Sequence, residues 1–298
     1  MDLTQAQMEF YDENGYLLLP ECFSTEEVEV LRNELPTVFG EDSPRRVIEK
    51  EGFIVRSVYG SHMANEIFRR LSRHPKLVNP ARQILESGVY VYQFKINAKA
   101  AFGGDVWEWH QDYIFWHNED GLPSPRVLTA AIFIDDVTEF NGPLFLIPGS
   151  HKWGIFDVPA RGLNSNVKSG TPSVYQESPE WINNLTANLK YSLPKEIIAR
   201  LVTERGIVAP KGPSGSVLFF HSNLAHGSPN NISPFDRVVT LISFNSTENI
   251  PVQSMMARPD FLVGRDYTPI DPMPEDVLFL PIDGQAAAAV PHLEKHVS

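Results

Sequence analysis

The sequence has few of the features that mark secreted or membrane-bound proteins. Its single cysteine, Cys22, rules out a disulfide within the chain. The first residues, Met1 to Gln5, do not form a basic stretch followed by an apolar run, which argues against a signal peptide. No run of about 18 or more apolar residues occurs, so we expect no transmembrane helix and no membrane partner. These absences favour a cytoplasmic protein.

An excess of positive charge is also missing. The formal net charge of −12 argues against nucleic acid as a partner, because phosphate binding requires a basic surface. With 298 residues, of which 42% are hydrophobic, the chain is long enough to bury a sizeable core. We found no internal repeat and no clean linker, and therefore expect one domain over residues 1–298. The expected partner is a small molecule, and the expected state is a monomer or a homodimer.

The periodicity of the sequence changes near residue 89. Residues 1–88 are predicted to be largely helical, with capping boxes at Thr4–Gln7 and Ser24–Glu27. Between residues 89 and 250, strand-like runs are separated by Gly, Pro and Asn turns, which is typical of an antiparallel sandwich or barrel. Residues 153–193 lack periodicity, and we interpret them as an inserted loop or lid. Residues 251–298 are expected to form an irregular tail.

A histidine and a carboxylate two positions apart indicate a metal site. On a strand, His110 and Asp112 would face the same side and could bind one metal ion. A second histidine near the end of the strand predicted at 215–221 would complete the set. Both His221 and His226 qualify, and spacing alone leaves that choice open. Two histidines and a carboxylate are the ligand set of non-haem Fe(II) oxygenases.

Aromatic residues surround this pair in the sequence. They are Trp107, Trp109, Phe115 and Trp116. In such an apolar setting, a carboxylate beside an imidazole needs a compensating partner, and a divalent cation supplies one.

Other polar residues are expected to meet ligands. Arg237 precedes a predicted strand at 238–244, where it is either a surface arginine or a buried bidentate clamp for a carboxylate. Gln93, Lys95 and Asn97 alternate with apolar residues and so share one strand face. That face either meets solvent or lines a cavity, and the sequence leaves both interpretations open.

Taken together, these motifs resemble the phytanoyl-CoA dioxygenase superfamily of Fe(II)/2-oxoglutarate oxygenases. The resemblance is carried by Trp109-His110-Gln111-Asp112, by Glu139-Phe140-Asn141-Gly142-Pro143, by Pro148-Gly149-Ser150-His151 and by His226-Gly227-Ser228 with Arg237 downstream. It implies a mostly β fold with a double-stranded β-helix core (jelly-roll, cupin-like) and flanking α-helices. It also implies Fe(II), 2-oxoglutarate and O2 as cofactor and co-substrates.

The resemblance assigns roles to individual residues. It makes His110, Asp112 and His226 the iron ligands, and Arg237 the partner of the distal 2-oxoglutarate carboxylate. Our full set of expected 2-oxoglutarate contacts is Arg237, Asn97, Ser228 and Lys95. The expected substrate contacts are Gln93, Trp116, Phe115 and His221.

Two bacterial branches of the superfamily are similar to this chain: ectoine hydroxylases, and hydroxylases of free aliphatic amino acids such as leucine. The ectoine branch tends to have Ser where this chain has Gln111, which favours the amino-acid branch. We therefore expect hydroxylation of an unactivated C–H bond in a small free amino acid, with ectoine 5-hydroxylation as the alternative. A carboxylate at Asp112 disfavours halogenation. A non-catalytic binding protein and a zinc hydrolase are the alternatives from other classes.

Overall fold

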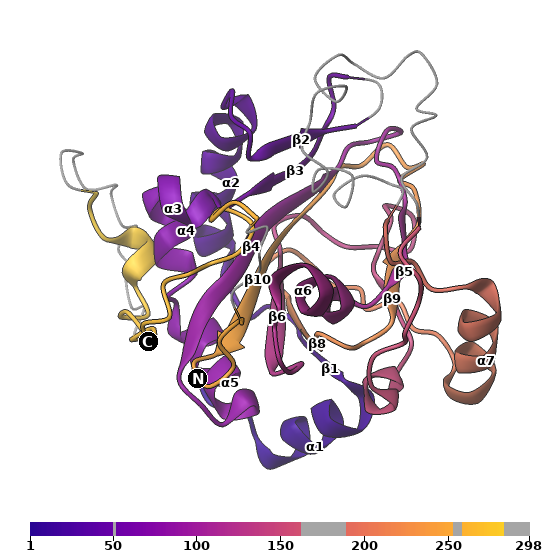
Figure 1. Cartoon of the computed structure of the whole chain (residues 1–298). Coiled ribbons are helices and arrows are strands. Elements are labelled where there is room, and N and C mark those ends of the chain that lie inside the picture. The colour runs from indigo at the N-terminus through magenta and orange to yellow at the C-terminus, as the bar shows by residue number, and fades with distance from the viewer. Residues whose placement is uncertain (50–51, 162–188, 253–257, 283–298) are drawn as a thin grey trace, which may run out of the picture.

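Two antiparallel sheets face each other in the computed structural model, which describes residues 1–49, 52–161, 189–252 and 258–282 (Figure 1). The large sheet has the strand order β1-β8-β6-β10-β4-β3-β2. Its strands are β1 (Tyr16–Leu19), β2 (Arg46–Ile48), β3 (Val55–Tyr59), β4 (Val89–Lys99), β6 (Val127–Phe133), β8 (Val217–His221) and β10 (Arg237–Ser246). The small sheet, in the order β5-β9-β7, contains β5 (Trp107–His110), β9 (His226–Ser228) and β7 (Phe145–Leu146). The predicted mostly β, jelly-roll architecture is confirmed.

The long strands β4 and β10 form the centre of the large sheet and pair along their whole length. Alternation along β4 gives its two faces opposite characters. Phe94 and Ile96 belong to the apolar core on the outer face, whereas Gln93, Lys95 and Asn97 point toward the small sheet. All five side chains are buried. The inner face is therefore a row of polar groups held away from bulk water.

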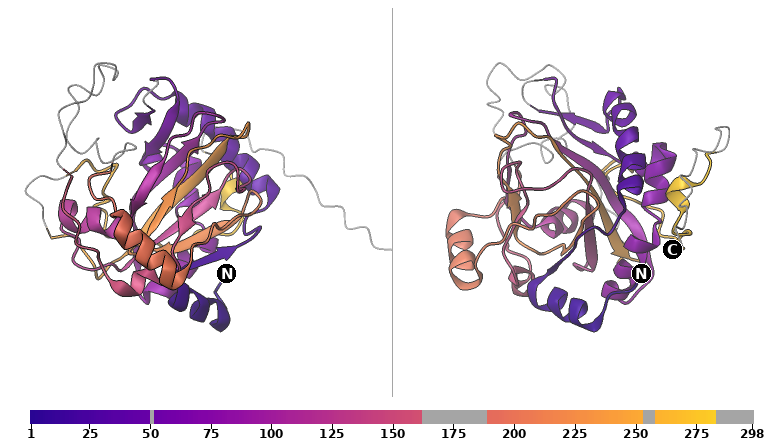
Figure 2. Two further views of the ribbon diagram at one scale, coloured as in Figure 1. Left: turned by 90° about the vertical axis from the view of Figure 1, so that its right-hand side faces the viewer. Right: turned by 180° about the vertical axis from the view of Figure 1, so that it is seen from behind.

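Helices cover the outer face of the large sheet (Figure 1). They are α2 (Thr25–Gly40), α3 (Ser61–Ala64), α4 (Glu66–Leu71) and α5 (Pro75–Leu85). The first helix, α1 (Gln5–Asn14), precedes the edge strand β1, and both predicted capping boxes are present at the starts of α1 and α2. On the other side of the molecule, α7 (Lys195–Arg205, orange in Figure 2) lies by the small sheet. Between the two sheets runs α6 (Asp112–Asp120), a helix that the strand-based prediction for this segment missed.

The chain before residue 89 contains strands as well as helices. It contributes three strands to the large sheet, because β1 pairs with β8 and β3 joins β4 to β2. Of the predicted insertion at 153–193, residues 162–188 lie outside the described part of the chain. Its two ends meet through a hydrogen bond from the Arg161 amide to the Lys190 carbonyl (2.9 Å), and a short 3-10 helix, η1 (Ser150–Trp153), precedes it.

The C-terminal segment is irregular where it is described. Its one short 3-10 helix, η4 (Val277–Phe279), lies against α4, where the Arg70 guanidinium donates to the carbonyls of Val277 (3.2 Å) and Pro281 (2.8 Å). Residues 253–257 and 283–298 lie outside the described ranges. No helix in the described ranges is long and apolar enough to cross a membrane.

A buried carboxylate on the helical layer makes the stability of the fold depend on pH. Glu27 accepts hydrogen bonds from Lys76 Nζ (2.7 and 2.9 Å) and from the Ser24 amide (2.7 Å). Burial raises the pKa of Glu27, but His74, Lys76 and Ser24 outweigh it and lower the pKa from 4.5 to about 2. Because the folded pKa is depressed, this stabilisation is fully present above pH 4.5 and is lost as the pH falls toward 2.

We therefore predict that Glu27→Gln lowers the free energy of unfolding at pH 7 by roughly 3–4 kcal/mol, at about 1.4 kcal/mol per pKa unit. The difference from the wild-type protein should shrink as the pH approaches 3. Urea denaturation at pH 7 and pH 3 measures both values. An equal loss at the two pH values would assign the effect to packing instead of charge.

Candidate functional site

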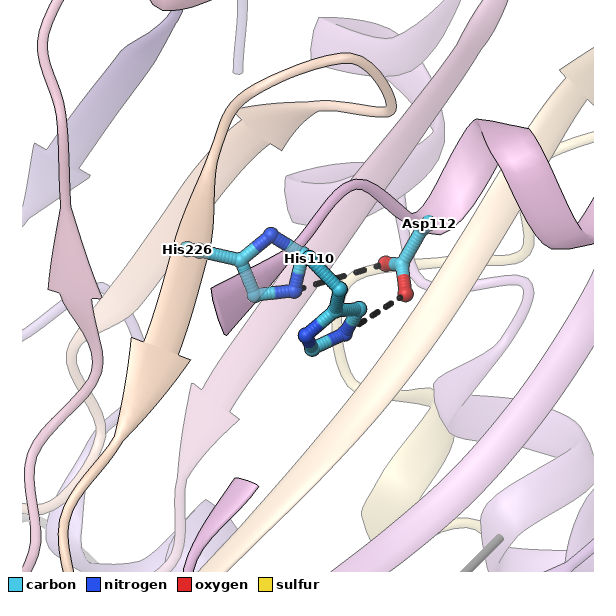
Figure 3. A group of neighbouring side chains, drawn as sticks. All are labelled: His110, Asp112 and His226. Atoms are coloured by element: carbon cyan, nitrogen blue, oxygen red, sulfur yellow. Dashed lines mark ion pairs between the residues drawn. The ribbon is translucent and has the colours of Figure 1, made fainter. Parts of the chain in front are cut away.

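Three potential metal ligands meet in the space between the two sheets (Figure 3). His110 ends β5, Asp112 begins α6, and His226 begins β9, where it stands opposite His110 in the strand register. Their ligand atoms all lie within 4.8 Å of one another, and all three residues are buried. Asp112 Oδ1 is 3.5 Å from His110 Nε2, and Asp112 Oδ2 is 3.9 Å from His226 Nε2. Among the described residues, this is the group whose side chains could hold a metal ion.

The carboxylate of Asp112 lies on a helix and not on the strand that was expected. Asp112 does not continue the strand, because the chain turns at Gln111 and Asp112 is the first residue of α6. The Gln111 side chain fixes the turn. Its Nε2 donates to the carbonyls of Gly154 (2.8 Å) and Asn223 (2.6 Å), and its Oε1 accepts from the Phe156 amide (2.8 Å). A strand-to-helix turn therefore brings the two ligands together, where the sequence predicted a shared strand face.

Backbone carbonyls fix the orientation of both imidazoles. His110 Nδ1 lies 2.6 Å from the Glu108 carbonyl, and His226 Nδ1 lies 2.8 Å from the Leu224 carbonyl. A carbonyl can only accept, so both Nδ1 atoms carry hydrogen, and in the neutral rings the Nε2 lone pairs point toward Asp112. Burial, followed by the neighbouring His110, lowers the pKa of His226 to about 3, which keeps this ring neutral at pH 7.

The negative charge of Asp112 also favours a bound cation at this cluster. Burial raises its pKa, but the positive charge of Lys95, followed by the two histidines, holds the pKa well below its usual value. The carboxylate is therefore ionised, and its Oδ2 has no hydrogen-bond donor in the described part of the chain. Two nitrogen lone pairs and a buried anion converge on one point. A divalent cation satisfies all three, so the residues present fit the ligand set of an open Fe(II) site.

A pocket opens beside the three ligands. Its lining combines two of these ligands, His110 and Asp112, with polar and aromatic groups, namely Tyr59, Gln93, Lys95, Trp107, Phe115, Trp116, Leu189 and Arg258. Gln93 and Lys95 point into it, so the inner face of β4 lines a cavity, which was one of the two interpretations left open. Gln93 is further held by a hydrogen bond from its Nε2 to the Leu262 carbonyl (3.0 Å).

Arg237 lies inside the fold, not on the surface. It begins β10 and is 3% exposed, on the same face of the large sheet as Asn97, because Val239 stands opposite Asn97. Burial lowers the pKa of Arg237 to about 10, with Asp135 opposing the shift, so the guanidinium remains charged. Its Nε has no acceptor, and Asn97 Oδ1 has no donor, among the described residues. Such a buried cation calls for an anionic ligand.

Two other predicted ligand contacts, Ser228 and His221, are not part of the pocket lining. Ser228 is buried on β9, and its hydroxyl donates to the Gly142 carbonyl (3.0 Å). His221 lies outside the pocket, since strand alternation directs Phe220 inward, 5.1 Å from the His226 ring, and His221 to the opposite face. There its ring lies at a tilt against that of His151, with 5.1 Å between the ring centroids. The structure therefore brings His226, not His221, to the ligand cluster.

Three pocket residues, Tyr59, Leu189 and Arg258, were not singled out from the sequence. Tyr59 lies opposite Lys95 in the register of β3 and β4, and the alternation of β3 could have indicated its inward direction. Arg258 reaches the pocket from an irregular segment more than thirty residues beyond His226. That segment has no periodicity from which its direction could be inferred.

We predict that His226→Ala abolishes binding of a divalent metal, whereas His221→Ala retains it. The first substitution removes a convergent lone pair, and the second alters a ring on the other face of β8. Titration of the metal-free variants with Mn(II), followed by calorimetry, measures both affinities. Loss of binding in the His221 variant with retention in the His226 variant would overturn the ligand assignment.

Comparison with known proteins agrees with this geometry. The chain is 41% identical over 268 residues to an L-proline trans-4-hydroxylase of Streptomyces griseoviridis, covering 90% of this chain and 95% of that protein. It is 36% identical over 271 residues to an ectoine dioxygenase of Bordetella bronchiseptica, covering 88% and 83%.

Solved structures of similar proteins have the same fold. The crystal structure of EctD from S. alaskensis with 2-oxoglutarate and 5-hydroxyectoine superposes with a TM-score of 0.73 at 30% identity, covering 88% of this chain and 84% of that one. EctD with bound Fe gives the same TM-score at 29% identity, covering 90% and 86%. The sequence pattern of the phytanoyl-CoA dioxygenase (PhyH) family matches residues 11–239. With its buried His-Asp-His cluster on a jelly-roll core, this chain belongs to the phytanoyl-CoA dioxygenase family.

Proposed function

We propose that this 2-oxoglutarate-dependent dioxygenase hydroxylates a ring carbon of a small cyclic amino acid, and that L-proline is the first substrate to test. The observation that carries the proposal is one pocket beside the His-Asp-His cluster, whose lining combines His110 and Asp112 with aromatic walls and a guanidinium group for a carboxylate. The 41% identity to an L-proline trans-4-hydroxylase supports this choice of substrate.

The metal would be held by His110, Asp112 and His226. Three protein ligands leave coordination positions open on an iron ion, as oxygenase chemistry requires. Iron(II) bound there, together with 2-oxoglutarate, supplies activation of O2 for the hydroxylation of an unactivated C–H bond. The role of the protein is to orient the two imidazoles through their Nδ1 hydrogen bonds and to keep Asp112 ionised.

The co-substrate would be bound by the inner faces of β4 and β10. The Arg237 guanidinium has the geometry for a bidentate interaction with the distal carboxylate of 2-oxoglutarate. Asn97, on the same face, and Ser228, on β9, are the neighbouring polar contacts, and Lys95 adds a second positive charge between Arg237 and the metal ligands.

The substrate would occupy the pocket between Gln93, Phe115, Trp116 and Arg258. The aromatic side chains form apolar walls that fit a compact ring and exclude water from the reacting atoms. Arg258 would bind the substrate carboxylate, because one edge of its guanidinium makes no hydrogen bond to a described residue. An acid with a small apolar body matches this combination.

Ectoine is the second candidate, because relatives at 33–36% identity are ectoine dioxygenases and EctD has a similar fold. It shares with L-proline a ring and a carboxylate, so the same pocket chemistry applies. Hydroxylation of leucine, the substrate favoured by the sequence motifs, stays a prediction without support from a named relative.

The decisive experiment incubates the purified protein with Fe(II), 2-oxoglutarate and O2 and with L-proline, ectoine or L-leucine in separate reactions. Mass spectrometry should detect a product heavier by one oxygen atom, formed with one succinate per product. We expect L-proline to be turned over most efficiently. Turnover of ectoine or leucine alone would reject the L-proline proposal. Activity that persists without O2 and with zinc in place of iron would favour the hydrolase alternative.

A second prediction concerns the co-substrate. Arg237→Ala should weaken 2-oxoglutarate binding by roughly 2–3 kcal/mol, or about 30- to 150-fold, because the buried carboxylate loses its partner. Arg126→Ala is the matched control, since Arg126 is a partly exposed arginine that pairs with Glu248. Calorimetric titration of the manganese-loaded proteins with 2-oxoglutarate measures the difference. Unchanged affinity in the Arg237 variant would reject the clamp.

A further inference from the structure

A buried network holds Arg258 in the pocket. Arg258 Nε donates to Asp120 Oδ1 (2.7 Å), and its Nη2 donates to Asp120 Oδ2 (2.5 Å). The Tyr92 hydroxyl donates to the same Oδ2 (2.5 Å). All three residues are at most 6% exposed. Asp120 thus fixes both the position and the plane of the guanidinium.

The pairing leaves part of Arg258 available. Asp120 occupies the edge formed by Nε and Nη2, while Nη1 makes no hydrogen bond to a described residue. A guanidinium carries five N–H donors, so its outer edge, Nη1 with the second N–H of Nη2, can bind another carboxylate. The orientation that Asp120 imposes therefore decides where the carboxylate of a substrate can lie.

The same helix carries Asp120 and a metal ligand. Asp112 is the first residue of α6 and Asp120 is the last, so the two are separated by about 12 Å at a rise of 1.5 Å per residue. The helix ends directly after Asp120 at Gly121, whose φ of +72° is left-handed, and a Cβ there would lie 2.5 Å from the Val252 carbonyl oxygen. Midway along α6, Trp116 lines the pocket and packs edge-on against Tyr92, with 5.2 Å between ring centroids. Helix α6 is thus a fixed spacer between the metal end and the carboxylate end of the pocket.

We propose that Asp120 is a positioning residue that selects which carbon of the substrate is hydroxylated. It acts through Arg258, by fixing the distance between the substrate carboxylate and the ligands His110, Asp112 and His226. This inference rests on the proposed function, since it requires a substrate with a carboxylate in this pocket.

If the Asp120–Arg258 pair only stabilised the fold, a change at Asp120 would not alter which carbon of the substrate is hydroxylated. The segment that carries Arg258 is also anchored by its backbone, because the Gly264 amide donates to the Tyr92 carbonyl (2.7 Å) and the Leu262 carbonyl accepts from Gln93 (3.0 Å). These bonds do not involve Asp120. Changing the length of the Asp120 side chain should therefore move the guanidinium while the segment remains in place.

The test compares Asp120→Glu with the wild-type iron-loaded enzyme on L-proline. Glutamate keeps the charge and the bidentate pairing but is longer by one methylene, so it displaces Arg258. We expect at least a fivefold change in the ratio of positional isomers of hydroxyproline, or in succinate released per hydroxylated product. The KM for L-proline should rise about tenfold, while the KM for 2-oxoglutarate should stay within twofold. Product analysis by chromatography and mass spectrometry measures these ratios.

Two further variants separate positioning from stability. Tyr92→Phe removes one hydrogen bond to Asp120 and should shift the same ratios in the same direction by a smaller factor, which provides a test if the Asp120 variant does not fold. Glu27→Gln also disrupts a buried ion pair, but on the helical layer, and should lower thermal stability with unchanged product ratios.

The outcomes distinguish the two proposals. Wild-type turnover of L-proline with unchanged isomer ratio, coupling and KM in folded Asp120→Glu and Tyr92→Phe variants overturns the positioning role alone. A wild-type enzyme that hydroxylates neither L-proline nor another of the tested acids overturns the proposed function, and the positioning role with it.

Discussion

The convergence of two imidazole lone pairs and a buried carboxylate is the constraint on which the rest of the structure depends. Without a cation, His110, His226 and Asp112 would present only electron-rich atoms to one another. The pairing of β5 with β9 places the two histidines opposite each other, and the start of α6 adds the carboxylate. The short strands of the small sheet and the turn at Gln111 are thus explained by the need to hold three ligand atoms around one ion.

The polar interior has a balance of charge that matches its proposed ligands. Three cations, Lys95, Arg237 and Arg258, face two carboxylates, Asp112 and Asp120, and a divalent metal would bring the net charge to plus three. A 2-oxoglutarate dianion together with one substrate carboxylate supplies minus three. A chain with a net charge of −12 therefore surrounds an interior that attracts anions. Each of these charges is costly to bury alone, which makes the complete assembly of ligands the favoured state.

Short-range patterns indicated the strands and the His110–Asp112 pair, whereas the resemblance to a known family supplied the jelly-roll fold and His226 as the third ligand. The alternation of Gln93, Lys95 and Asn97 predicted a common face, although only the packing of the sheets determined that this face is inside. Spacing left the choice between His221 and His226 open and the family resemblance favoured His226. In the structure, strand alternation directs His221 away from the pocket. The local prediction that His110 and Asp112 share a strand was wrong, because a helix begins at Asp112.

Of the pocket residues that sequence reasoning missed, Arg258 comes from the irregular end of the chain, and its position has a consequence for specificity. The proposed metal ligands and co-substrate contacts lie on strands or at the first turn of α6, where register and capping fix them. Arg258, by contrast, sits on a segment without regular structure that is held by a few identified hydrogen bonds to β4 and α6. Changes in such a segment alter the substrate end of the pocket without disturbing the metal end. Relatives that share a catalytic core can therefore differ in substrate. In this chain, the contacts of Arg258 would determine which substrate is preferred.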